Sequence, residues 1–222
     1  MIANQFQKRS VRNIEFSFGV NKTQRSILKY LKKWLPSFLK EIDSQFQCTA
    51  KEDDVSEQLM KFLQKRMKKT DLLINLDRSW GSDFQFTTDM MGLGEKPIFL
   101  MEAKRLPPTS THDYVHHHNK SGGISRFKLE RPGFGKHLTS SAMIGYVQKK
   151  GFDHWFEKVN TWVSSLIEES SQGSELHWSK DDMLIEVEKN QMIVEYTSTH
   201  VRVSEEPICL THFWLNMALP TK

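Results

Sequence analysis

The chain has 222 residues, a formal net charge of +4 and 38% hydrophobic residues, including 14 Phe and 6 Trp. This length and apolar content suit one domain with a substantial core, and the mild positive charge is compatible with nucleic-acid binding without indicating it. The chain lacks the roughly 18 consecutive apolar residues of a membrane span, and its two cysteines, Cys48 and Cys209, have no metal-ligand spacing, so we expect a cytoplasmic protein that does not enter a membrane.

Two helices are predicted first. Residues 22–46 have the period of an amphipathic helix that Pro36 kinks or divides. Its lysine-rich side is a solvated face or, alternatively, a surface for a partner or a phosphate backbone. Lys51-Glu52-Asp53-Asp54 starts a second helix that runs to about Lys69, because acidic residues suit the first turn of a helix.

The next two segments, Ser82–Phe86 and Ile98–Arg105, are predicted to form a β-hairpin. The apolar run that opens the second segment is too short for a helix and is rich in strand formers. The turn Met91-Gly92-Leu93-Gly94 supplies glycines where φ must be positive. In this register Asp83 lies opposite Glu102, with the Cβ atoms about 5 Å apart.

The hairpin therefore predicts a small cluster of charges. Glu102 and Lys104 are two residues apart and project from the same face of their strand. Two carboxylates beside an ammonium group make a site for a divalent cation, since Mg²⁺ prefers carboxylate oxygen. Asp89 is the rival to Asp83, because a shifted register would bring it to Glu102 instead. The alternative for the triplet is an ordinary surface ion pair, but a charge at the end of a buried strand is costly unless it is paired or coordinated.

The long segment from Thr109 to Leu138 combines glycines with basic residues. A loop of this length in a compact domain is usually functional or mobile. We interpret it as a flap that grips phosphate or, alternatively, as a structured insertion. The candidate nucleic-acid contacts are Arg126, Lys128, Arg131 and Lys136. Three consecutive histidines from His116 are interpreted as polar loop residues, because adjacent side chains do not easily aim at one metal ion.

The remainder of the chain predicts a strand over 140–148, a helix over 151–169 and further strands beyond a polar linker. We therefore expect a single α/β domain over 1–222, with a mixed β-sheet flanked by helices. Residues 1–50 would be a helical extension, 51–170 the core, and 171–222 a β-rich C-terminal extension that covers a sheet edge or docks a partner.

With Asp83 one strand before Glu102-Ala103-Lys104, this core resembles the PD-(D/E)XK nuclease superfamily over roughly residues 52–150, although Ser82 stands where the family often has proline. The resemblance implies a restriction-endonuclease-like core. It also implies Mg²⁺, with Mn²⁺ as a substitute, held by Asp83, Glu102 and a helix glutamate, for which Glu57 is the candidate. The alternative for Glu57 is a simple helix-start acid. Lys104 would orient the attacking water or neutralise developing charge, and the Ala103 carbonyl would be a further ligand.

The function that this resemblance implies is metal-dependent endonucleolytic cleavage of DNA, with RNA as another substrate. The pattern Gly122-x3-Arg126-Phe127 and the segment Met143–Tyr146 also look like small bacterial nuclease-like proteins of phage defence. Such a protein acts alone, as a homodimer, or with an ATPase or sensor subunit. The alternatives are a catalytically inactive nuclease-fold subunit and a hydrolase of another phosphate ester. The chain has no GxxxxGK[ST] phosphate loop and no GxSxG nucleophile motif.

Overall fold

A computed structural model describes residues 21–42, 49–67, 72–76, 83–88, 96–108, 112–116, 122–130, 134–170 and 176–218. The helices of these ranges are α1 (Lys22–Glu41), α3 (Glu52–Met67), α4 (Gly123–Leu129), α5 (Phe152–Ser170) and the short 3₁₀ helix η2 (Lys180–Asp182). The strands are β1 (Leu72–Asn75), β2 (Phe84–Thr88), β3 (Phe99–Leu106), β4 (Ser140–Val147), β5 (Ile185–Lys189), β6 (Ile193–Val201) and β7 (Pro207–Asn216).

The seven strands form one sheet in the order β1-β2-β3-β4-β7-β6-β5. β1, β2 and β3 are antiparallel to one another, β4 runs parallel to both β3 and β7, and β6 and β5 return to antiparallel pairing. The predicted α/β class with a mixed sheet is therefore confirmed. The C-terminal strands continue the sheet from β4, because every residue of β4 pairs with a residue of β7. The turn expected at 91–94 lies outside the described residues.

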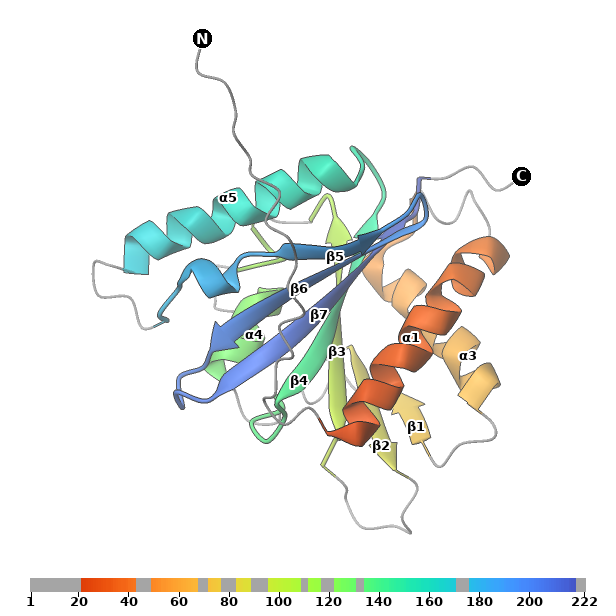
Figure 1. The fold of residues 1–222 in the computed structure, drawn as a ribbon. Coiled ribbons are helices and arrows are strands. Elements are labelled where there is room, and N and C mark those ends of the chain that lie inside the picture. Colours follow the sequence, from red (N-terminus) through yellow and green to blue (C-terminus); the bar gives the residue numbers. More distant parts are fainter. Residues whose placement is uncertain are drawn as a thin grey trace.

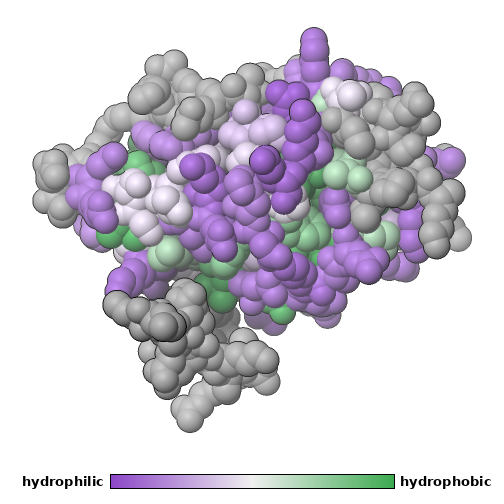
Figure 2. Space-filling view, turned by 90° about the horizontal axis from the view of Figure 1, so that it is seen from above, coloured by the Kyte–Doolittle hydropathy of each residue, from purple (hydrophilic) through white to green (hydrophobic). Residues whose placement is uncertain are grey.

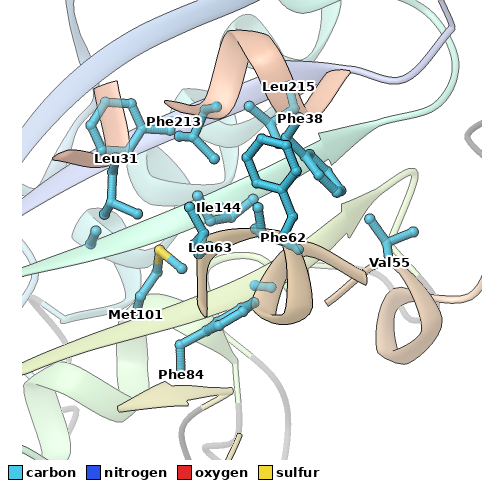
Figure 3. Packing of buried hydrophobic residues seen from close by; sticks show 14 of the residues in the cluster. Leu31, Phe38, Val55, Phe62, Leu63, Phe84, Met101, Ile144, Phe213 and Leu215 are labelled. Carbon is cyan, nitrogen blue, oxygen red and sulfur yellow. The ribbon is translucent and has the colours of Figure 1, made fainter. Parts of the chain in front are cut away.

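Helices cover both faces of the sheet, which gives three layers (Figure 1). α1 and α3 pack on one face, where large side chains from both helices meet the inward residues of β2, β3, β4 and β7 (Figure 3). Leu31, Phe38 and Leu63 are among these helix residues, and Met101 and Phe213 are among the strand residues. Burial of each such side chain stabilises the fold by roughly 1.5–3 kcal/mol. This layer fixes α3, and with it the start of that helix, against β3.

The second core lies between the other face of the sheet and α4 and α5. α5 contributes Trp155, Val159 and Trp162, which recur at helical spacing along its buried side. At β4 the sheet approaches Trp214 so closely that a Cβ on Gly145 would lie 2.4 Å from the Trp214 Cδ1 atom. Glycine at this position is therefore required by packing. The side chains of residues 102 and 104 project into this same layer, since they alternate with those of β3 that face α1 and α3.

One face of the molecule shows a mainly polar surface over the described residues (Figure 2). Figure 2 shows one face on which hydrophilic residues dominate and hydrophobic ones form small separate areas. Every residue of the edge strand β5 is exposed, and its pairing with β6 is interrupted by a bulge between Glu186 and Glu188. Charge and a bulge on an edge strand discourage further strand pairing. Among the described helices, none has the length and apolar character needed to cross a membrane.

Candidate active site

The candidate site begins where β3 runs beyond its neighbour. β2 pairs with β3 only as far as Met101, whereas β3 continues to Leu106. The backbone N–H groups on the open edge of β3 still need acceptors. Asp83, immediately before β2, accepts a hydrogen bond from the Ala103 N–H at 2.7 Å through Oδ2. Glu52, the first residue of α3, accepts one from the Arg105 N–H at 2.7 Å through Oε2. Two carboxylates thus stand along this edge.

Glu102 and Lys104 project from the sheet face between these contacts. The Glu102 side chain is fully buried, and that of Lys104 is 8% exposed. The Lys104 Nζ atom lies 3.0 Å from Glu102 Oε1, as expected for residues two apart on one strand. The pairing of β2 with β3 ends at Phe84–Met101, and extending this register by one residue would place Asp83 opposite Glu102.

Two further side chains complete what we call the Glu102 cluster, which consists of Glu52, Asp83, Glu102, Lys104 and Arg126. Arg126, on α4, donates from Nη1 to Glu102 Oε1 at 2.7 Å. Lys104 also donates to Glu52 Oε1, at 3.2 Å. The cluster therefore joins α3, the start of β2, β3 and α4 in one network of charges.

Burial and mutual repulsion dominate the electrostatics of this cluster. Burial and the nearby charge of Asp83 raise the pKa of Glu102 to about 8, although Lys104 and Arg126 act in the opposite direction. Burial likewise raises the pKa of Glu52, against the opposing charge of Lys104. Burial disfavours the charge on Lys104, but the carboxylates of Glu102 and Glu52 outweigh it, so the pKa of this ammonium group is raised. The raised pKa of Glu102 favours its protonated form near neutral pH, so a cation that binds there would take the place of a proton, while Lys104 stays charged.

The residues present suit a hard divalent cation in their chemistry. The Glu102 Oε2 atom is buried and has no hydrogen-bond partner among the described residues, which is costly for a carboxylate oxygen. Asp83 supplies a second carboxylate at the same place. Mg²⁺ is commonly held by one or two carboxylates together with water and substrate phosphate. Within the described ranges no three His, Cys, Asp or Glu side chains are grouped to hold a metal. Two carboxylates would therefore supply the protein's side-chain ligands, and the remaining positions would be left for water and substrate.

The structure does not bring Glu57 into the cluster. Its carboxylate lies on the exposed side of α3 and pairs with Lys61 at 2.5 Å, with the Glu57 side chain 52% exposed. The helix glutamate at the site is Glu52. A signal for this assignment is present in the sequence, because Val55 and Leu59 mark the buried stripe of α3 and Glu52 lies three residues before Val55 on that same stripe. The rival Asp89 lies outside the described residues.

The four predicted nucleic-acid contacts separate into different environments. Arg126 is part of the Glu102 cluster, and Lys136 is exposed. The prediction for Lys128 is corrected, because its ammonium group is fully buried and pairs with Asp182 at 2.6 Å. Lys128 also lies over the ring of Trp178, 4.6 Å from its centroid. Its role in this conformation is to anchor α4, and phosphate does not reach it. Arg131 lies outside the described residues.

A second polar network, which the sequence analysis did not find, lies in the same layer as the cluster. We call it the buried relay, and its members are Asp182, His200, Ser198, His212, Tyr114 and Trp214. His200 lies 2.5 Å from Asp182 Oδ1 and 2.7 Å from Ser198 Oγ, which are the contacts of a Ser-His-Asp triad. All three side chains are buried, however, and Ser198 Oγ also bonds His212. A nucleophile must meet its substrate, so we interpret this network as structural.

No protein-family model, curated protein or solved structure matches this chain. The function must therefore be inferred from the geometry of the Glu102 cluster. The cluster combines a buried carboxylate oxygen that no described residue hydrogen-bonds, a second carboxylate and a charged lysine at an open strand edge. Chemically, this arrangement can hold a divalent cation and present a positive charge beside it.

Proposed function

We propose that this protein is a metal-dependent nuclease that hydrolyses phosphodiester bonds of DNA. The observation that carries the proposal is the Oε2 atom of the buried Glu102, which has no hydrogen-bond partner among the described residues and lies next to Asp83 and Lys104. A buried carboxylate oxygen retained without a hydrogen bond is costly for stability, so a ligand is the simplest reason for it.

The arrangement of the elements supports the resemblance to a restriction-endonuclease-like core. α3 precedes the antiparallel strands β1, β2 and β3, and β4 then lies parallel beside β3, with α5 following it. The acid before β2, the Glu-x-Lys triplet on β3 and the glutamate at the start of α3 converge in this frame. In the proposed function, Glu52 takes the role first assigned to Glu57.

The roles of the residues follow from their positions. Asp83 and Glu102 would hold Mg²⁺ or Mn²⁺, with the Ala103 carbonyl on the same open edge as a further ligand. The metal, when bound, supplies polarisation of the phosphodiester and a water of lowered pKa. Lys104 keeps its positive charge close to Glu102 and would orient that water or neutralise charge that develops on the phosphate oxygens. The exposed Lys136 contributes a contact to the phosphate backbone.

The test is cleavage of supercoiled plasmid, linear duplex and single-stranded DNA with Mg²⁺, Mn²⁺ or EDTA. We expect metal-dependent cutting that falls by at least about 100-fold in Glu102→Gln and in Lys104→Met, since loss of a group at the reacting centre typically costs this much. Glu52→Gln is expected to impair cleavage. Glu57→Gln removes the same charge from the exposed side of the same helix and is the matched control, with wild-type activity expected.

Thermal unfolding of each variant separates a lost site from a lost fold. Equal activity in wild type, Glu102→Gln and Lys104→Met would refute the proposed site. A protein that binds DNA without cutting it under any metal condition would instead be a nuclease-fold subunit without catalysis.

A further inference from the structure

The charges of the Glu102 cluster do not balance. Three carboxyl groups, from Glu52, Asp83 and Glu102, face two basic side chains, Lys104 and Arg126. With all three acids ionised, as metal ligation requires, the formal charge of this group without Arg126 would be −2, which one divalent cation neutralises. With Arg126 in place the formal charge is −1, and a divalent cation would leave an excess of positive charge. The formal charges therefore favour either Arg126 or a divalent cation beside Glu102, but not both together.

The two basic side chains are held very differently. Lys104 is 8% exposed and bonds both Glu102 and Glu52. The Arg126 side chain is 27% exposed, so part of it borders solvent, whereas Lys104 is almost completely enclosed. Arginine also lies on a long side chain with several rotamers. Arg126, and not Lys104, is the positive charge that can leave.

The helix that carries Arg126 is itself fixed. On another side of α4, Lys128 is buried against Asp182 at 2.6 Å, and the Lys128 carbonyl accepts a hydrogen bond from the Val203 N–H at 3.0 Å. At the start of α4, the Gly123 N–H donates to the Asp113 carbonyl at 3.0 Å. The helix backbone is thus held at both ends, and an exchange at Glu102 needs only the Arg126 side chain to move.

We propose that Arg126 is the resident counter-ion of Glu102 in the metal-free protein, that it gives up this contact when a divalent cation binds, and that it thereby sets the cation affinity of the site. This inference rests on the proposed function, because it takes Glu102 as a metal ligand. The physical reason is that a guanidinium group and a divalent ion on one desolvated carboxylate repel each other across a few ångströms of low-dielectric surroundings. The displaced guanidinium stays at the mouth of the site, where its paired donors match a phosphate group.

The test is calorimetric titration of MnCl₂ into the metal-free protein without DNA. We expect Arg126→Ala to bind Mn²⁺ about 10-fold more tightly than wild type, since the competitor is gone. Arg126→Lys keeps the charge and is expected to fall between the two. Arg25→Ala removes an exposed arginine from the first turn of α1 and is the matched control for net charge, with wild-type affinity expected.

The outcomes separate the two proposals. Equal or weaker Mn²⁺ binding by Arg126→Ala, with binding by wild type intact, overturns the counter-ion inference and leaves the proposed function standing. Absence of Mn²⁺ binding in wild type and in both Arg126 variants overturns the metal-dependent function itself. If Arg126→Ala does not fold, Arg126→Gln still tests the proposal, because it removes the positive charge and keeps a polar side chain. An Arg126→Gln protein that binds Mn²⁺ no more tightly than wild type would overturn the counter-ion inference.

Discussion

At the scale of single residues, two lysines from one basic segment lie in opposite environments. Both Lys128 and Lys136 fit a phosphate-binding flap by composition, but only Lys136 is exposed. Lys128 lies inside, where burial lowers the pKa of its ammonium group against the opposing charge of Asp182. A basic residue in a loop-like sequence is therefore a poor guide to a binding surface when part of that segment folds into the core.

This difference predicts that substitution of Lys128 lowers stability, whereas substitution of Lys136 weakens DNA binding. Lys128→Met keeps the side-chain bulk but leaves Asp182 buried without its cation, so we expect the free energy of unfolding to fall by about 3 kcal/mol. Lys136→Met is expected to leave the free energy of unfolding within about 0.5 kcal/mol of wild type. It is expected to weaken DNA binding and to reduce the slope of log affinity against log salt concentration by about 1. Urea unfolding and DNA binding at several salt concentrations measure both effects. A stable Lys128→Met protein that loses DNA affinity would show that Lys128 reaches the surface.

At the scale of elements, the buried relay ties the C-terminal strands to the rest of the layer. The Trp214 N–H can only donate, so the Tyr114 hydroxyl accepts a hydrogen bond from it. The Tyr114 hydroxyl in turn donates a hydrogen bond to His212 Nδ1. His212 then donates through Nε2 to Ser198, whose hydroxyl donates onward to His200. In this direction every donor has an acceptor while both imidazoles stay neutral. The relay is thus satisfied only when neither histidine carries a second proton.

The neutral relay predicts a loss of stability in mild acid. Burial lowers the pKa of His200, and it lowers that of His212 well below its usual value. The unfolded chain takes up protons near the ordinary value of about 6.5 while the folded protein does not, so stability is fully present above that pH and is lost as the pH falls. We expect a slope of about 1 kcal/mol per pH unit for each histidine below pH 6.5.

Urea unfolding between pH 7.5 and 5.5 measures this slope. His212→Gln is expected to have a shallower dependence on pH than wild type. His154→Gln changes an exposed histidine on α5 and is expected to keep the wild-type slope. Glu102 and Glu52, whose pKa values are raised, contribute a slope of the opposite sign over this range, so the test is the difference between wild type and His212→Gln. An equal dependence on pH in these two proteins would contradict the neutral relay.

The elements also show what could be predicted and what could not. β2, β3 and their register follow from local pattern, since the apolar run beginning at Ile98 and the position of Asp83 are visible in the sequence. β1 was not predicted, because four residues carry little periodicity and the strand depends on pairing with β2. The relay joins Tyr114 to Trp214, 100 residues apart, so no spacing rule could reveal it. Glu52 was missed for a different reason, since the helix phase that identifies it was readable.

At the scale of the whole molecule, the segments expected to be extensions are parts of one core. α1 contributes Leu31 and Leu35 to the same apolar cluster as Phe213 of β7. β7 lies between β4 and β6, so the sheet that carries the Glu102 cluster continues through the C-terminal strands. The segment 51–170 thus contains the candidate site but not all of the layers that hold it in place.

This architecture predicts that residues 1–170 do not fold alone. Removal of β5, β6 and β7 opens the edge of β4, in which all eight residues are buried in the full chain. It also removes Leu210, Phe213, Trp214 and Leu215, each at most 2% exposed, and the loss of roughly 1.5–3 kcal/mol for each is comparable with the entire stability of a typical domain. An uncovered central strand also invites association with other chains.

Expression of 1–170 beside the full chain tests this, with soluble yield and cooperative urea unfolding as the measurements. We expect 1–170 to be insoluble or to unfold without a cooperative transition, because the sheet ends at an unprotected buried strand. Co-expression with residues 171–222 as a separate chain is the matched control, and it is expected to restore soluble protein, since the missing strands pair with β4 through backbone hydrogen bonds. A fragment 1–170 that unfolds cooperatively with wild-type stability would mean that the β-rich segment is an addition to a complete core. The candidate site would then owe its geometry to α3, β2, β3 and α4 alone.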